Sequence, residues 1–217
     1  MIAENIRTLH QVIPPSVVLV AVSKTKPVED ILEAYGEGQR DFGENRVQEM
    51  LSKYHALPKD IRWHMIGHVQ TNKIKDFIPF VHMVHGIDRL SVLETLEKEA
   101  AKAGRRVDAL LQLHIAQEET KFGFSAEEIL PLCTPTYFQQ FPHVRLRGFM
   151  GMASFTEDKQ QIKREFSALK SLFLIAKQQL DTNHWDTLSM GMSGDYPLAL
   201  SEGSTLVRIG SALFGNR

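Results

Sequence analysis

The stretch LVAVSKTKP, Leu19–Pro27, decides the fold, because it reads as a buried strand that ends in a lysine. It belongs to a β-branched run that is typical of a strand covered on both faces. Side chains alternate along a strand, so Val18, Val20 and Val22 share one face with Lys24. Lys24 therefore either reaches solvent at a strand end or stands at the end of a core.

Strand-like and helix-like segments alternate along the rest of the chain. Strands are expected over 16–22, 40–44, 62–67, 82–87, 106–115, 144–152, 187–192 and 204–210. Helices are expected over 27–38, 45–57, 70–81, 88–104, 125–133, 157–180 and 195–203, after an amphipathic first helix over 2–13. The helix after the last strand is short or cut off. Asp88 is a possible helix cap, and Ser125 with Glu128 has the spacing of a capping box.

This alternation predicts an α/β fold with a parallel sheet and helices outside it. Eight repeats within 217 residues predict a single (β/α)8 TIM-type barrel with an extra N-terminal helix, and residues 1–217 form one domain. A doubly wound sheet is the alternative. No GxGxxG follows the first strand, which weakens a dinucleotide-binding interpretation.

Composition narrows the classes of function. The net charge of −1 gives no argument for a nucleic-acid partner or an anionic membrane surface. The single cysteine, Cys133, cannot form an internal disulfide. No secretory signal is recognised at the N-terminus. No apolar run approaches the ~18 residues of a membrane span. We therefore expect a cytoplasmic protein.

In a barrel, functional residues gather at the carboxyl ends of the strands. Ser193-Gly194 and Gly210-Ser211 follow the last two strands, where barrels often bind phosphate. Glycine lets backbone N–H groups approach an anion closely, and serine adds a hydroxyl donor. These four residues are therefore suited to a phosphate site.

An arginine is expected inside the barrel on the last strand. Arg208 shares a face with Leu206 and Gly210, whereas Val207 and Ile209 lie on the face that should meet the outer helices. A buried guanidinium is costly without a partner. A bound anion or a heteroaromatic nitrogen would supply one.

Lys24 and the phosphate-type loops together suggest chemistry on a phosphorylated aldehyde. Burial in a barrel mouth lowers the pKa of a lysine, and the neutral amine can attack an aldehyde. Pyridoxal 5′-phosphate is a phosphorylated aldehyde that forms such a Schiff base. A Schiff-base aldolase acting on a sugar phosphate is equally compatible with these residues.

Five segments in order make the sequence recognisable: AVSKTKP, FGENRVQE, WHMIGHVQTNK, LSMGMSGD and VRIGSALFG. Together they resemble the pyridoxal phosphate homeostasis protein family, and the match extends from about Val18 to Gly215. That family resembles the N-terminal barrel of alanine racemase and binds pyridoxal phosphate. The resemblance supports the same barrel and implies this cofactor.

The resemblance also implies roles for individual residues. Lys24 would carry the Schiff base, while Ser193, Gly210 and Ser211 would hold the phosphate. Arg208 would face the pyridine nitrogen. Asn45 would lie against the cofactor. Ser211 stands where the family pattern leads us to expect threonine after RIG, and it keeps the hydroxyl.

By this resemblance the protein is a carrier, buffer or regulator of the cofactor rather than an efficient enzyme. An arginine at the pyridine nitrogen keeps the ring unprotonated, which makes it a poorer electron sink. Alanine racemase uses a second domain that supplies an opposing tyrosine, and none of the four tyrosines of this sequence replaces it. We therefore expect no catalytic residue and no metal. A weak pyridoxal phosphate-dependent amino-acid racemase is the alternative. The expected partners are the cofactor and the apo forms of enzymes that use it, with the protein itself a monomer.

Simpler roles remain open for several residues. Asn45 could cap a helix. Arg208 could pair with an inward carboxylate. His64 and His68 have the i, i+4 spacing of a zinc pair, but the segment reads as a strand followed by a loop, so a metal is not expected. Lys121 is expected to be a loop ion-pair partner, with a direct role at the cofactor mouth as the alternative.

Overall fold

The structure is a computed structural model that describes residues 1–118, 122–180 and 183–215. Lys121 lies outside the described residues. Eight strands are present: β1 Val18–Val22, β2 Asp41–Glu44, β3 Arg62–Met65, β4 Val81–Ile87, β5 Val107–Leu113, β6 Val144–Gly151, β7 Thr187–Ser189 and β8 Leu206–Ile209.

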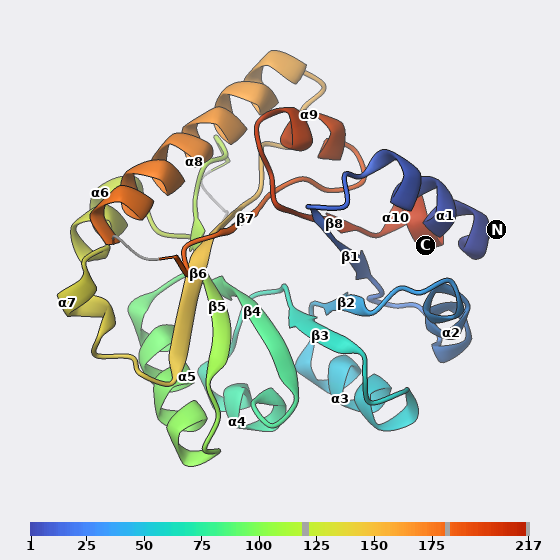
Figure 1. Cartoon of the computed structure of the whole chain (residues 1–217), viewed down its shortest axis with the longest axis horizontal. Coiled ribbons are helices and arrows are strands. Elements are labelled where there is room, and N and C mark those ends of the chain that lie inside the picture. Colours follow the sequence, from blue (N-terminus) through green and yellow to red (C-terminus); the bar gives the residue numbers. More distant parts are fainter. Residues whose placement is uncertain (119–121, 181–182, 216–217) are drawn as a thin grey trace.

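The eight strands form one closed parallel barrel in sequence order, β1 to β8. β1 and β8 close it, with Val18 beside Leu206 and Val20 beside Arg208. Figure 1 shows the strands at the centre and the helices around them. The predicted (β/α)8 barrel is confirmed, and the doubly wound alternative is wrong because β1 pairs with both β2 and β8.

Helices surround the barrel. They are α1 Ile2–Val12, α2 Val28–Gly36, α3 Val47–Ala56, η1 Thr71–Lys73, α4 Ile74–Phe77, α5 Leu90–Lys102, α6 Ala126–Ile129, η2 Leu130–Leu132, α7 Pro135–Phe138, α8 Lys159–Leu180, α9 Tyr196–Ser201 and α10 Ser211–Phe214. The extra N-terminal helix α1 packs beside α10, and the Asn5 amide donates to the Leu213 carbonyl at 2.9 Å (Figure 1). Over the part of the chain that the structure describes, no helix is both long and apolar enough to span a membrane.

Prolines shorten two of the predicted helices. The helix expected over 70–81 is the single turn η1 followed by α4, which ends at Phe77, two residues before Pro79. A proline has no backbone N–H, so Pro79 cannot continue the helical hydrogen bonds by donating to the carbonyl of Lys75. The segment 125–133 is likewise divided into α6 and the 3-10 turn η2, which has Pro131 in its first turn.

The two predicted helix caps have different outcomes. Ser125 and Glu128 form the expected capping box at the start of α6. Asp88 does not cap α5, because Arg89 occupies the N-cap position without a side-chain cap bond. The Asp88 carboxylate instead accepts from His68 at 2.7 Å and from Arg89 at 2.6 Å.

The barrel has two separate apolar cores. The larger core lies between the strands and the helices and includes Val207 and Ile209 of β8. The smaller core fills the barrel interior and is made by Val20, Met83, Leu110, Met150 and Leu206. The predicted division of β8 is confirmed, since Leu206 points inward while its neighbour Val207 faces outward.

The inward face of β1 explains why a valine strand ends in a lysine. Val18 lies at the amino-end mouth of the barrel and Val20 lies in the interior core. Val22 and Lys24 line a cavity at the opposite mouth. Three valines thus cross the barrel from end to end, and Lys24 is the next inward position after the core.

Gly148 of β6 is required by its backbone and by its neighbour. Its φ of +148° is rarely adopted by L-residues, and a Cβ there would overlap the Thr187 carbonyl oxygen. We expect Gly148→Ala to lower the free energy of unfolding by at least about 2 kcal/mol, as measured by chemical denaturation. Gly36→Ala is the matched control, because a Cβ at the end of α2 would meet nothing within 4 Å. Equal denaturation midpoints for the two variants would contradict this account.

Candidate functional site

A cavity of about 390 Å³ opens at the carboxyl ends of the strands, the end at which this fold binds ligands. Its wall is made by Val22, Lys24, Thr25, Lys26, Asn45, Ile66, Met152, Met192, Ser193, Gly194, Arg208, Gly210, Ser211 and Gly215. All seven residues predicted as a cofactor site lie in this wall. The volume is within the roughly 300–1,000 Å³ of small-molecule sites.

A tight turn after β1 places Lys24 in the wall, where its side chain is half-buried. Thr25 has a φ of +66°, a left-handed conformation that is uncommon for a β-branched residue. Two contacts hold the turn. The Thr25 amide donates to Glu49 Oε1 at 2.5 Å, and the Lys26 amide donates to the Ser23 carbonyl at 3.0 Å.

A buried charged network supports this turn from below. Lys53 Nζ of α3 donates to Glu44 Oε1 at 2.8 Å, to Glu49 Oε1 at 2.7 Å and to the Ser23 carbonyl at 2.7 Å. The Ser23 hydroxyl also donates to Glu44 Oε1 at 2.7 Å. Burial raises the pKa of Glu44, and the hydrogen bonds from Lys53 and Ser23 oppose that rise. The network ties the ends of β1 and β2 to α3.

Arg208 points into the barrel as predicted and is 4% exposed. Nη1 donates to the Ser189 carbonyl at 3.0 Å and to Ser189 Oγ at 2.5 Å, and Nη2 donates to the Gly151 carbonyl at 3.2 Å. Burial lowers the pKa of the guanidinium to about 10, and the charge of Asp195 opposes this shift. Arg208 is therefore charged at neutral pH. Its hydrogen bonds go to neutral oxygens, not to the inward carboxylate considered as an alternative.

The loops after β7 and β8 meet through Ser193. Its hydroxyl oxygen accepts from the amides of Gly210 and Ala212, both at 3.2 Å. A Cβ at Gly194 would meet nothing within 4 Å, so this part of the wall is open. The loops thus bring serine hydroxyls and glycine backbone to one side of the cavity, beside Ser211. Because the Ser193 oxygen already accepts from these two amides, its hydroxyl proton is left to donate, and hydroxyl donors suit an anion.

Asn45 lies in the wall and does not cap α3, whose N-cap is Arg46. Gly67, after β3, packs against it so closely that a Cβ there would lie 2.5 Å from the Asn45 carbonyl oxygen. Because glycine permits this approach, the backbones after β2 and β3 lie together at the cavity.

Sequence reasoning missed the apolar part of the wall, made by Ile66, Met152 and Met192. Met152 could have been found, because it lies two positions after Met150 of the interior core and therefore on the same face. The turn residue Thr25 and the supporting residue Lys53 carried no comparable signal. Their roles depend on contacts between segments.

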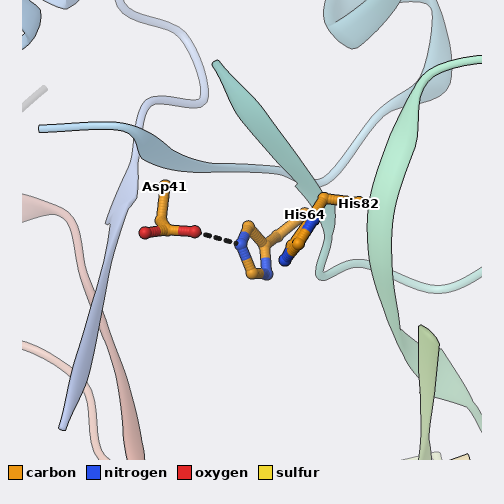
Figure 2. Close-up of side chains that lie close together, drawn as sticks. All are labelled: Asp41, His64 and His82. Atoms are coloured by element: carbon orange, nitrogen blue, oxygen red, sulfur yellow. Dashed lines mark hydrogen bonds and ion pairs between the residues drawn. The ribbon is translucent and has the colours of Figure 1, made fainter. Parts of the chain in front are cut away.

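A second polar group lies toward the amino-end mouth of the barrel. His64 Nε2 contacts Asp41 Oδ1 at 3.0 Å, whereas His68 contacts Asp88, so the two histidines have different partners. Asp41, His64 and His82 place three potential metal-ligating atoms within 4.8 Å of one another (Figure 2). Arg62 already donates to both Asp41 oxygens, at 2.8 and 2.5 Å, and its charge disfavours a cation there.

Comparison with known proteins assigns the family. The family model of the alanine racemase N-terminal domain matches residues 1–217. A pyridoxal phosphate homeostasis protein of Pasteurella multocida is 40% identical over 205 residues, which cover 93% of this chain and 87% of that protein.

Solved structures agree with this assignment. PipY of Synechococcus elongatus PCC7942 without PLP superposes with a TM-score of 0.94 at 35% identity, covering 99% of this chain and all of that one. The PLP-bound form of PipY gives 0.91. Alanine racemase from E. faecalis shares the fold, with a TM-score of 0.79 at 15% identity, and this chain covers 58% of its length. The chain therefore belongs to the alanine racemase N-terminal domain family, and within it to the group of relatives named pyridoxal phosphate homeostasis proteins.

Proposed function

We propose that the protein binds pyridoxal 5′-phosphate in the 390 Å³ cavity and acts in the homeostasis of this cofactor as a carrier, buffer or regulator. The observation that supports this most is the shared wall of Lys24, Arg208 and the Ser193–Ser211 loops. The Pasteurella multocida relative is named a pyridoxal phosphate homeostasis protein, and PipY was solved with PLP bound. A cofactor-free aldolase has no comparable support.

The residues of the wall fit the chemical groups of this cofactor. An amine suits its aldehyde, hydroxyl and backbone donors suit its phosphate, and methionine and isoleucine side chains suit its ring. We assign the covalent link to Lys24, the phosphate to Ser193, Gly194, Gly210 and Ser211, and the ring face to Asn45. When bound, the cofactor can stabilise negative charge on an attached amine substrate.

Arg208 is assigned to the pyridine nitrogen. As a charged guanidinium it can only donate hydrogen bonds, so it favours an unprotonated ring nitrogen. A neutral ring withdraws electrons less strongly than a protonated one. The site thus favours holding the cofactor over efficient carbanion chemistry.

Among the described residues of the cavity wall, the ionisable side chains besides Lys24 are Arg208 and Lys26, which donates to the Phe214 carbonyl. None of the described residues that line the cavity is a tyrosine. The Tyr35 hydroxyl, for example, donates to Asp60 at 2.8 Å, away from the cavity. We infer that the protein is not an efficient enzyme. A weak amino-acid racemase is the second candidate, because alanine racemase shares the fold.

We also propose a cellular location, an oligomeric state and partners for the protein. We place the protein in the cytoplasm as a monomer, with apo forms of pyridoxal phosphate enzymes as recipients of the cofactor. The overall charge of −1 supports neither a nucleic-acid nor a membrane partner. Size-exclusion chromatography with light scattering tests the monomer.

The covalent link is tested with two lysines of the same wall. Borohydride reduction of PLP-loaded protein should fix a pyridoxyl adduct on Lys24, as located by peptide mass spectrometry. Lys24→Ala should abolish the adduct, because Lys26, the other lysine that lines the cavity, is directed to the Phe214 carbonyl. Lys26→Ala is the matched control and should keep it, since Lys26 donates to the Phe214 carbonyl at 3.0 Å. An adduct on a different lysine in the unsubstituted protein would refute the assignment.

The phosphate assignment is tested at Ser211. Ser211→Ala should weaken binding of pyridoxal phosphate by roughly 10-fold, the loss of one hydrogen bond to a charged group. Binding of unphosphorylated pyridoxal should change little, because that ligand makes no such bond. Ser201→Ala on exposed α9 is the control, since its hydroxyl donates within the helix. Equal losses for the two ligands at Ser211→Ala would exclude a phosphate role.

The non-enzymatic assignment is tested in deuterated water. PLP-loaded protein incubated with each L-amino acid should show no α-proton exchange by NMR at ordinary enzyme rates of about 1–10³ per second. Rapid exchange or racemisation would establish the racemase instead. Transfer of the cofactor to an added apoenzyme faster than its release into buffer would support delivery, and transfer at the release rate would contradict it.

A further inference from the structure

A line of buried polar side chains crosses the barrel from its amino-end mouth to the cofactor cavity. Its members are Asp41 of β2, His64 of β3, His85 of β4, Ser189 of β7 and Arg208 of β8. The contacts are Asp41 Oδ1 to His64 Nε2 at 3.0 Å, His64 Nδ1 to His85 Nε2 at 2.9 Å, His85 Nδ1 to Ser189 Oγ at 3.1 Å and Ser189 Oγ to Arg208 Nη1 at 2.5 Å. All five residues are less than 9% exposed.

The two ends of this line favour one order of protons. A guanidinium can only donate, so the Ser189 oxygen accepts from Arg208, and in this order the Ser189 hydroxyl donates to His85 Nδ1. His85 then carries its proton on Nε2 and donates to His64 Nδ1. His64 in turn carries its proton on Nε2 and donates to Asp41. An ionised carboxylate can only accept, so the line ends there.

Charges at the amino-end mouth keep Asp41 ionised. Arg62 donates to both of its oxygens, and although burial opposes ionisation, the bonds from Arg62 and His64 hold the pKa of Asp41 well below its usual range. The opposite proton order in a neutral His64 would present a bare Nε2 to Asp41 and so require a neutral carboxyl, and with Asp41 ionised it would require a charged His64 that donates from both nitrogens. Burial also lowers the pKa of His85 far below its usual value, which agrees with a neutral ring that accepts from Ser189 and donates to His64.

We propose that Asp41, His64, His85 and Ser189 form a directed hydrogen-bond relay that positions Arg208 for the cofactor. The relay keeps the Ser189 oxygen available as an acceptor for Arg208 Nη1. The guanidinium is also anchored by the Ser189 and Gly151 carbonyls. These four are positioning residues, because none of them lines the cavity.

The relay also explains the group drawn in Figure 2. His64 uses both ring nitrogens in the relay. Figure 2 shows the contact of its ring with Asp41. The centroid of the His82 ring lies 5.3 Å from that of His64, but His82 is not a member of the relay. Hydrogen bonding, with Arg62 as the counter-charge, therefore accounts for this group without a metal ion.

The proton order is tested first in the apo protein. Histidine ¹⁵N NMR should show His64 and His85 neutral near pH 7, with the proton on Nε2 in both rings. A charged His85, or an Nδ1 proton on either ring, would overturn the relay. This measurement does not involve the cofactor, so its result stands even if the proposed function fails.

The link to the cavity rests on the proposed function and is tested by a double-mutant cycle. Ser189→Ala should raise the dissociation constant of pyridoxal phosphate by roughly 10-fold, as the loss of an outer hydrogen-bond partner does at metal sites. Asp41→Asn should weaken binding in the same direction, and the double variant should bind no more weakly than Ser189→Ala alone. Distant substitutions add when they share no network. Additive losses for Asp41→Asn and Ser189→Ala would therefore refute the coupling.

Asp108→Asn is the matched control at the same mouth of the barrel. Asp108 of β5 is also buried and paired with arginines, accepting from Arg145 at 2.5 Å and from Arg147 at 2.7 Å. It makes no contact with the relay. Asp108→Asn should leave cofactor affinity unchanged, both alone and in combination with Ser189→Ala. A loss of affinity equal to that of Asp41→Asn would overturn the proposal. If the unsubstituted protein binds no pyridoxal phosphate, the function fails while the NMR result still decides the relay.

Discussion

The buried charge of Arg208 is the constraint on which the rest of the site depends. A guanidinium inside a barrel needs acceptors on several sides, because an unpaired buried cation is strongly destabilising. Here the acceptors come from β6 and β7, as two carbonyl oxygens and one hydroxyl. The barrel interior is therefore filled partly by polar side chains and partly by the small apolar core, which includes Leu206 and Met150.

On the other side of the cavity, a turn positions the lysine. Lys24 lies in this turn, whose left-handed residue, Thr25, donates its amide to Glu49. Glu49 is held in turn by Lys53, which also binds Glu44. Strained backbone persists where the surrounding contacts over-determine it. The cavity thus has two supports that differ in chemistry, an ion-pair network under β1 and a line of hydrogen bonds through two histidines and a serine under β8.

Much of this arrangement was predictable from local pattern. Alternation of strands and helices predicted the barrel, and the period of two along β1 and β8 predicted that Lys24 and Arg208 point inward. The cofactor roles of the site residues remain predictions. The helix over 70–81 was predicted too long because tertiary packing and Pro79 ended it at Phe77. His64 and His68 have the spacing of a zinc pair, but the two rings have different partners, which could not be foreseen.

By itself the sequence determined the order of the elements, the inward faces of the strands and the loops that carry glycine and serine. These features depend on neighbours within a few positions, where backbone geometry sets which side chains share a face. Only the tertiary structure decided that Asp41, His64, His85 and Ser189 join into one line beneath Arg208. Barrel closure and the register between strands bring these residues together, and no local pattern encodes a hydrogen bond between side chains from β2 and β3 or from β4 and β7.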